Sequence, residues 1–380
     1  MYTEQELLEI ISRFATASEA ESIKAMGPGF INDTLIVTTR PDATGHAPKY
    51  ILQRKNHNVF PDVPGMMNNI ALVTEHLRRK VSGRGGDPDR EVLKVIRRKP
   101  ESMSEEEKAA TGGDLYYKDN KGNYWAVCLF IEGSVTYEKA DSPALAYKGG
   151  EAIGKFQSML ADFTLPLSET IRGFHNIRWR FRQWEESLRN DAAGRASSLR
   201  EEIGWIESRK KEMLAFWELV ENGTLPTRVT HNDTKISNIL FDKDGNVLCV
   251  IDLDTCMSST SLNDFGDAIR SYTNTGAEDD KDLSRVSMSM EMFRAYTAGY
   301  LSQRKDTLCE SEVQYLAFSA LYITFEQVLR FLMDYIDGDK YYKTAYPEHN
   351  LVRTRAQYRL LRSMEEQYAQ MQAVVRELMK

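Results

Sequence analysis

The 380-residue chain is poor in cysteine, with only Cys128, Cys249, Cys256 and Cys309, and no two of them form a C-x-x-C pair. Scattered cysteines of this kind indicate reduced thiols rather than disulfides or a zinc site. The chain also lacks an apolar run near the roughly 20 residues that a membrane-spanning helix needs. Its start, MYTEQELLEI, has neither the basic nor the apolar region of a secretory signal. We therefore expect a cytoplasmic protein with no membrane partner.

An excess of positive charge is absent as well, since 49 Lys and Arg stand against 56 Asp and Glu, a formal charge of -7. Proteins that bind nucleic acid need clustered Lys and Arg to neutralise phosphates, so we expect no nucleic-acid partner. The content of 42% hydrophobic and 28% charged residues is typical of a globular protein. At about 150 residues per domain, the length suggests two domains.

The pattern of apolar residues changes near residue 135. Before it, helix and strand signals alternate; after about residue 140, helical spacing dominates. The predicted strands are 34–39, 49–53, 92–96, 115–117 and 124–131, and the predicted helices are 4–16, 63–79, 143–160, 178–222 with a break near 192–196, 284–303, 310–337 and 347–379. We predict an α+β chain in which a mostly antiparallel sheet of about five strands, with one internal helix, precedes a larger, mainly helical part.

A single β segment, 229–251, interrupts the helical part and contains the candidate catalytic residues. From His231 it reads H-x-D-x-K-x-x-N, and Asp252 closes an apolar strand fourteen residues after Asn238. Phosphoryl transfer needs a carboxylate beside the attacking hydroxyl and oxygen ligands for Mg²⁺ on the phosphates. Asp233 suits the first task. Asn238 and Asp252 suit the second, because a hairpin would bring its start and finish to the same open end.

Two further residues of this segment have expected roles. Lys235 could reach the γ-phosphate and spread its charge, and His231 is expected to orient the loop by hydrogen bonds. The alternative is a buried polar hairpin with a capped loop, because Asp, Asn and Ser also serve turns. Five residue types at these offsets favour the catalytic interpretation.

The segment resembles the catalytic loop and metal strand of the aminoglycoside phosphotransferase and choline kinase group, which shares the protein-kinase-like fold. Within that group the sequence is most similar to the N-acetylhexosamine 1-kinases, and the similarity extends along most of the chain. The residues that carry it are 27–34, 50–53, 60–62, 228–240, 251–255, 264–267 and 346–355.

This resemblance implies a two-lobed fold with a nucleotide-binding lobe over residues 1–132 and a catalytic, substrate-binding lobe over 133–380. It implies that Asp233 is the base and that Arg330 and Tyr341 bind the sugar. It also implies ATP and Mg²⁺, with Asn238 and Asp252 as metal ligands. The nucleotide residues that it implies are Gly27, Gly29, Gln53, Phe130, Ile131 and Glu132. Gln53 stands where protein kinases carry a lysine.

We predict that the protein transfers the γ-phosphoryl group of ATP to the anomeric hydroxyl of N-acetylglucosamine or N-acetylgalactosamine. The epimer and the oligomeric state stay open. The alternatives are a kinase for choline, an aminoglycoside or another sugar, and a catalytically inactive nucleotide-binding module. A protein substrate is not expected, because no D-F-G or A-P-E motif is present. Choline would need an aromatic cage, yet no tryptophan follows Trp217.

Three weaker signals have competing interpretations. The run from Gly149 to Phe156 imitates a phosphate-binding loop, but Phe156 stands where Ser or Thr must hold magnesium, so we expect an amphipathic helix. Glu75 either pairs with a cation or lies on a solvated helix face. Asp264 and Asp267 either orient the catalytic loop or cap a helix near residue 268, and we favour the cap.

Overall fold

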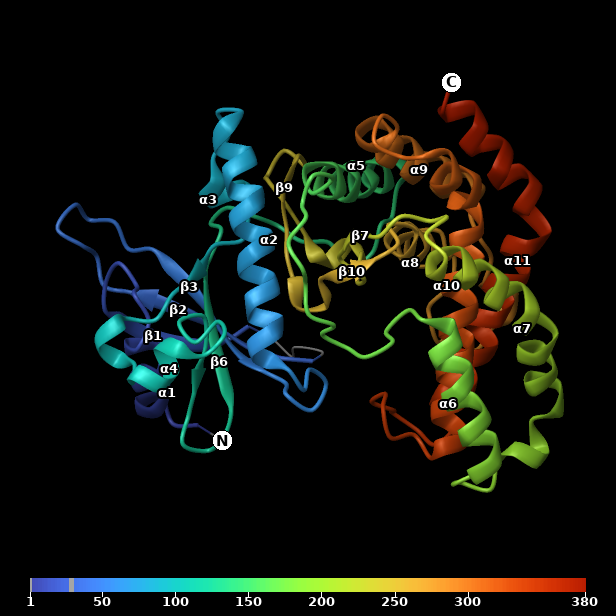
Figure 1. Cartoon of the computed structure of the whole chain (residues 1–380), viewed down its shortest axis with the longest axis horizontal. Helices are drawn as coiled ribbons and strands as arrows, with labels where there is room; N and C mark the ends of the chain where they lie inside the picture. The colour runs from blue at the N-terminus through green and yellow to red at the C-terminus, as the bar shows by residue number, and fades with distance from the viewer. Residues whose placement is uncertain (1, 27–30) are drawn as a thin grey trace. The chain divides into compact units, whose positions relative to one another are not determined.

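The computed structural model describes residues 2–26 and 31–380, so the predicted nucleotide residues Gly27 and Gly29 lie outside the described part. The chain forms two compact units (Figure 1). Unit 1 contains an antiparallel sheet and unit 2 consists mainly of helices, which confirms the predicted α+β class. The lobe boundary after residue 132 stays a prediction. Unit 1 comprises Met1–Thr136, Asp162–Arg172 and Ile239–Ser258, and unit 2 comprises Tyr137–Ala161, Gly173–Asn238 and Ser259–Lys380.

The main sheet of unit 1 has six strands rather than about five. Its order is β1 (Ala20–Ala25), β2 (Asp33–Thr39), β3 (Lys49–Lys55), β6 (Tyr124–Leu129) and β4 (Val95–Ile96), and β5 (Tyr117–Lys118) also pairs with β6. The sequence did not predict β1, because AESIKA has a single β-branched residue and only weak alternation. Strands β4 and β5 are shorter than predicted.

The core of unit 1 lies between α1 and the sheet. Helix α1 (Glu4–Ser12) starts with a capping box between Thr3 and Glu6 and directs Ile10 and Ile11 into this core, where Trp125 is also buried. The other helices of unit 1 are α2 (Val63–Gly83), α3 (Pro88–Glu91) and α4 (Glu105–Ala109). Helix α4 was not among the predicted helices, and a Ser104–Glu107 capping box starts it.

The part of the β segment after Asn238 belongs to unit 1 and forms a hairpin. Strands β8 (Ile239–Phe241) and β9 (Val247–Val250) pair with Ile239 opposite Val250, as predicted. The turn between them is closed by Asp242, whose Oδ1 accepts the backbone N–H groups of residues 244 and 246. After β9 come a short 3₁₀ turn, Leu253–Thr255, and β10 (Met257–Ser259).

Unit 2 is organised around α10 (Glu310–Asp337). This helix packs against α6, α8 and α11. Among the described helices, α10 alone has the length and apolar content of a membrane span, but 94% of that apolar stretch is buried, as in a core helix. The remaining elements of the unit are α5 (Pro143–Met159), α6 (Ile177–Asn190), α7 (Arg200–Glu221), β7 (Arg228–Thr230), α8 (Leu262–Tyr272), α9 (Met290–Arg304) and α11 (His349–Leu378).

The glycines that imitate a phosphate-binding loop lie inside α5, as expected. They allow α5 and α9 to approach closely. A Cβ atom at Gly150 would lie 2.1 Å from the carbonyl oxygen of Tyr296, and one at Gly299 would lie 2.0 Å from that of Tyr147. Both distances are far below contact, so these glycines serve helix packing.

Candidate active site

The predicted base, Asp233, lies in the loop after β7 and is held by its own loop. Its Oδ2 accepts hydrogen bonds from Lys235 Nζ at 2.8 Å and from Asn238 Nδ2 at 2.9 Å. Asn238 Nδ2 also donates to the backbone carbonyl of Asp233 at 2.9 Å. The ring nitrogen Nδ1 of buried His231 accepts the N–H of Asp233 at 3.3 Å. The two hydrogen bonds to the carboxylate, from Lys235 and Asn238, both use Oδ2, so within the described part of the chain Oδ1 is the oxygen left for a substrate hydroxyl.

The electrostatics of the loop keep Asp233 ionised. Burial opposes the charge, but the Lys235 ammonium, the neighbouring His231 ring and the amide of Asn238 outweigh it and hold the pKa of Asp233 below its usual value. A carboxylate with this pKa is fully ionised near neutral pH. It is therefore in the protonation state that a proton acceptor requires.

Asp264 and Asp267 anchor the backbone of the catalytic loop. The buried carboxylate of Asp264 accepts the N–H of His231 at 3.0 Å and that of Asn232 at 2.7 Å, and Asp267 accepts the N–H of Thr234 at 2.8 Å. The preferred interpretation, a helix cap, is therefore wrong. Helix α8 already starts at residue 262, so both aspartates lie inside it and face the loop.

Two residues of the candidate site have an unusual backbone conformation. Asn232 has φ 65° and Asp252 has φ 61°, the left-handed region that costs a residue other than glycine about 1 kcal/mol. One precedes the predicted base and the other is a predicted metal ligand. Such strain is held in place by surrounding contacts and is concentrated at functional sites.

The donor set fits a magnesium ion that is shared with phosphates. Among the described residues, no three His, Cys, Asp or Glu side chains gather as a complete metal site. Mg²⁺ needs fewer protein ligands, because one or two side-chain oxygens plus phosphate oxygens and water fill its shell. Asn238 uses its amide nitrogen on Asp233, so its amide oxygen is the atom left for a metal.

The predicted adenine segment, Phe130 to Glu132, follows β6 in unit 1. Some of its backbone groups already have protein partners: the N–H of Phe130 donates to Lys49, the carbonyl of Ile131 accepts from Ser134, and that of Glu132 accepts from Arg90. Within the described chain, the carbonyl of Phe130 and the N–H groups of Ile131 and Glu132 have no such partner. One acceptor and two donors therefore remain.

Gln53 lies near the end of β3, and its side chain contacts Lys55 on the same face of the strand. Lys55 Nζ donates to Gln53 Oε1 at 2.8 Å and forms an ion pair at 2.8 Å with Asp254, two residues after Asp252. Glu75 instead pairs with Arg97, and both are about half exposed. Neither Lys55 nor Asp254 was among the site residues predicted from the sequence.

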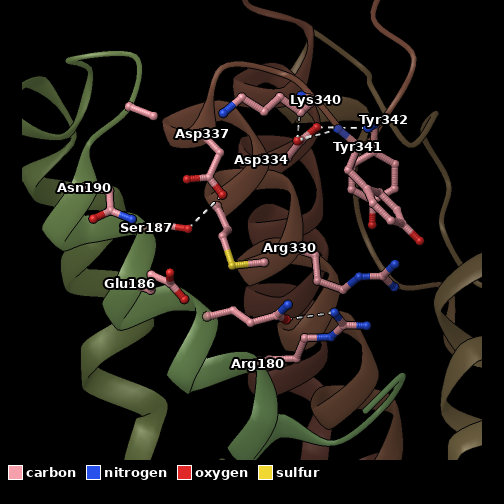
Figure 2. Close-up of a pocket in the computed structure, with 13 residues that line it drawn as sticks. Arg180, Glu186, Ser187, Asn190, Arg330, Asp334, Asp337, Lys340, Tyr341 and Tyr342 are labelled. Atoms are coloured by element: carbon pink, nitrogen blue, oxygen red, sulfur yellow. Dashed lines mark hydrogen bonds between the residues drawn. The ribbon is translucent and has the colours of Figure 1, made fainter. Parts of the chain in front are cut away.

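Arg330 and Tyr341 line one pocket of about 410 Å³ in unit 2 (Figure 2). Arg330 projects from α10, and Gly338, with φ 93°, ends that helix and turns the chain back. The Arg330 guanidinium lies 5.7 Å from the ring centroid of Tyr341 and 5.6 Å from that of Tyr342. The structure therefore brings together two residues that are eleven positions apart, as expected; their role stays a prediction.

Asp334 shapes the wall of the pocket that carries Tyr341. Its carboxylate accepts the backbone N–H groups of Lys340, Tyr341 and Tyr342 at 2.8–3.0 Å and the side-chain amide of Asn350 at 2.8 Å. Figure 2 shows the bonds from Asp334 on α10 to the backbone of Lys340, Tyr341 and Tyr342 in the returning segment. Asn350 belongs to the 346–355 motif, so this motif holds the pocket wall in place.

A buried polar cluster links the pocket to the catalytic loop. Glu326 lies 2.7 Å from His175 Nδ1, 3.4 Å from Arg180 and 3.9 Å from Arg330. The other ring nitrogen of His175 lies 3.4 Å from the carbonyl of Asn232, directly before the base. Glu326, Arg330 and Asp334 recur every four residues in the apolar helix α10. That spacing was the available sequence signal for this cluster.

Comparisons with known proteins show the family and the fold of the chain. Residues 22–300 match the model of a phosphotransferase enzyme family, APH. An aminoglycoside phosphotransferase from Alicyclobacillus acidocaldarius superposes with a TM-score of 0.57 at 14% identity, covering 100% of this chain and 97% of its own. An amicoumacin kinase, solved with AMP-PNP, Ca²⁺ and its antibiotic, gives 0.58 at 12% identity, covering 96% and 94%.

A choline kinase from Cryptosporidium parvum gives a TM-score of 0.55 at 14% identity, covering 96% of each chain. At these identities the likeness shows the fold. It confirms the predicted protein-kinase-like architecture and does not distinguish among acceptors.

Proposed function

This chain belongs to the phosphotransferase enzyme family, and from that premise we propose that it is an ATP-dependent kinase that phosphorylates the anomeric hydroxyl of an N-acetylhexosamine. The observation that carries the proposal is the pocket of Arg330 and Tyr341, in the same unit as Asp233 and connected to its loop through His175 and Glu326.

In the proposed reaction the acceptor hydroxyl gives its proton to Asp233 Oδ1 and attacks the γ-phosphorus of ATP. The bond from that phosphorus to the β,γ-bridging oxygen breaks, so the products are ADP and the sugar 1-phosphate. Lys235 and Asn238 fix the carboxylate through its other oxygen. Most of the catalysis comes from orienting the hydroxyl and from balancing charge on the phosphates.

In this proposal the backbone carbonyl of Phe130 and the N–H of Glu132 pair with the adenine edge. The amide oxygen of Asn238 and the carboxylate of Asp252 are the groups that would hold Mg²⁺, which would supply positive charge to the phosphates.

The charges of the pocket favour a neutral, polar acceptor. Two of its three carboxylates already have partners, because Asp334 accepts four hydrogen bonds and Asp337 accepts one from Ser187, while the third, Glu186, is exposed. Arg330, in contrast, makes long contacts, 3.5 Å to Gln327 and 3.9 Å to Glu326. A guanidinium has five N–H donors, so donors remain for a sugar hydroxyl or an acetamido oxygen.

The same arrangement disfavours cationic acceptors such as choline or an aminoglycoside. A quaternary ammonium would bind over aromatic faces, but the Arg330 guanidinium already lies over Phe174, Tyr341 and Tyr342 at 5.2–5.7 Å. Arg180 lies close enough to Arg330 that the two charges repel: burial and Arg330 together lower the pKa of Arg180. A third cation at this wall would add to the repulsion.

The test is ADP release with N-acetylglucosamine, N-acetylgalactosamine, choline, ethanolamine and an aminoglycoside, using Asp233→Asn as the blank. We expect an N-acetylhexosamine to give the highest kcat/KM and a product with phosphate on the anomeric oxygen. The blank should lose at least about 100-fold in kcat, the lower end for a positioned base, and still bind ATP. A cationic acceptor with the highest kcat/KM would reject the proposed acceptor. ATP binding without turnover of any acceptor would favour the inactive module.

A further inference from the structure

The proposed acceptor pocket of unit 2 is elongated and follows α6 and α10 (Figure 2). Its lining on α6 runs from Arg180 to Asn190, two positions of one helix. At the α-helical rise these positions lie about 15 Å apart along the axis. On α10 the lining runs from Arg330 to Asp337, about 10 Å by the same rise. The pocket is therefore longer than a single pyranose ring.

The two ends of the pocket differ in how they connect to the catalytic loop. The inner end, at Arg180 and Arg330, is joined to it, because both guanidinium groups contact Glu326 of the buried cluster that reaches the loop. At the outer end Ser187 on α6 donates to Asp337 on α10 at 2.8 Å. The two contacts show that α6 and α10 run in the same direction. A monosaccharide whose reacting hydroxyl points to the loop occupies the inner end and does not reach the outer end.

The outer end has polar side chains that are available to a ligand. Glu186 and Asn190 on α6 and Lys340 after α10 line the pocket and are exposed. In the described part of the chain, their side chains make no hydrogen bond or ion pair within the protein. The amide Nε2 of Gln183 is also available there, since only its Oε1 is used, by Arg180 at 3.0 Å. Amide, carboxylate and ammonium groups together offer both donors and acceptors to hydroxyl groups.

The charges of the outer end favour a neutral group. Figure 2 shows Glu186 and Asn190 of α6 on one side of the pocket and Asp337 and Lys340 on the other. The one ammonium is accompanied by two carboxylates, so a phosphate or carboxylate substituent would meet repulsion as well as attraction. A quaternary ammonium would find no aromatic face among these four side chains. A second sugar ring, which is neutral and rich in hydroxyl groups, matches this lining.

We propose that the acceptor is a neutral disaccharide with the N-acetylhexosamine at its reducing end, and that the outer end binds the second sugar. The inference rests on the proposed function and deepens it. The N-acetylhexosamine must be the reducing-end unit, because only that unit has a free anomeric hydroxyl. The reaction is unchanged: this hydroxyl gives its proton to Asp233 and bonds to the γ-phosphorus of ATP, and the bond from that phosphorus to the bridging oxygen breaks.

The experiment measures kcat/KM on the full chain for the N-acetylhexosamine that reacts best alone and for three disaccharides. In these, galactose is β-linked to O3, O4 or O6 of that N-acetylhexosamine, as its hydroxyl configuration allows. We expect the best disaccharide to exceed the monosaccharide roughly 10-fold or more, the effect of one or two hydrogen bonds. Asn190→Ala and Lys340→Met should each lower this ratio. Arg189→Ala, an exposed neighbour outside the pocket lining, should leave the ratio unchanged.

The outcomes separate this inference from the proposed function. If the monosaccharide reacts and no disaccharide exceeds it, the pocket holds one sugar and only the inference fails. If a disaccharide is preferred and both Asn190→Ala and Lys340→Met keep the full preference, the second sugar lies elsewhere and the inference also fails. If neither the monosaccharide nor any disaccharide is phosphorylated, the proposed function itself fails.

Discussion

His175 and Glu326 form a buried pair 2.7 Å apart, from residues 151 positions apart in the sequence. The imidazole is also in contact with the carbonyl before Asp233, and the carboxylate is near two arginines of the pocket. This pair therefore joins the loop that carries the proposed base to the wall that carries the proposed acceptor residues. We therefore expect a substitution in the catalytic loop to affect the pocket wall, and a substitution in the pocket wall to affect the catalytic loop.

Lys235→Met should change the pH dependence of turnover. In the wild type the charge of Lys235 outweighs burial and holds the pKa of Asp233 below its ordinary value, so kcat/KM for the acceptor should show no carboxylate limb above about pH 5. Without the ammonium, less positive charge compensates the burial that opposes ionisation, so the pKa of Asp233 rises. On acidification, activity is then lost at a higher pH than in the wild type. Rate profiles from pH 4.5 to 8 measure this shift. Lys243→Met, in the exposed hairpin turn, is the control. An unshifted acid limb in Lys235→Met would contradict the predicted coupling.

Asp252→Ala should remove the effect of magnesium on ATP binding. We expect calorimetry to show that Mg²⁺ strengthens ATP binding to the wild type but not to the variant, because the carboxylate that we propose as a metal ligand is gone. Asp244→Ala, which removes an exposed carboxylate from the β8–β9 turn, should behave as the wild type. An equal gain from Mg²⁺ in Asp252→Ala would assign the metal to another residue.

Arg330→Ala should raise the KM for the N-acetylhexosamine roughly 10-fold or more, because a charged donor to the sugar is lost. The KM for ATP should change little. Arg182→Ala, on the exposed face of α6, is the matched control. Equal effects on the two substrates, or no effect on either, would place the acceptor elsewhere in the protein.

The variants Asp334→Ala and Asp337→Ala each remove one carboxylate from the pocket. Comparing them distinguishes the effect of losing the hydrogen bonds that hold the pocket wall from the effect of losing a negative charge. Both residues lie on α10 and line the pocket, but Asp334 holds three backbone N–H groups and Asn350, whereas Asp337 holds Ser187. We expect Asp334→Ala to lower the free energy of unfolding by at least about 2 kcal/mol and to raise the acceptor KM. Asp337→Ala should cost under about 1 kcal/mol. Denaturant unfolding and steady-state kinetics measure both. Similar losses in the two variants would argue against the anchoring role.

The sequence by itself determined the local features. The segment from His231 to Asn238 could be recognised because its functional groups lie within eight residues of each other, and the backbone loop alone sets their spacing. The α+β class followed from apolar periodicity, which depends on the geometry of single helices and strands. The β8–β9 hairpin followed from its turn residues for the same reason.

The tertiary structure decided what joins distant parts of the chain. Lys55 meets Asp254 across 199 residues, and His175 meets Glu326 across 151. From the sequence, Asp264 and Asp267 were predicted to cap a helix. In the structure they lie inside α8 and accept hydrogen bonds from the catalytic loop. In each case the residue types are common ones, and their partner depends on how helices and strands pack. Packing arises from burial of apolar surface over the whole fold, and no short stretch of sequence encodes it.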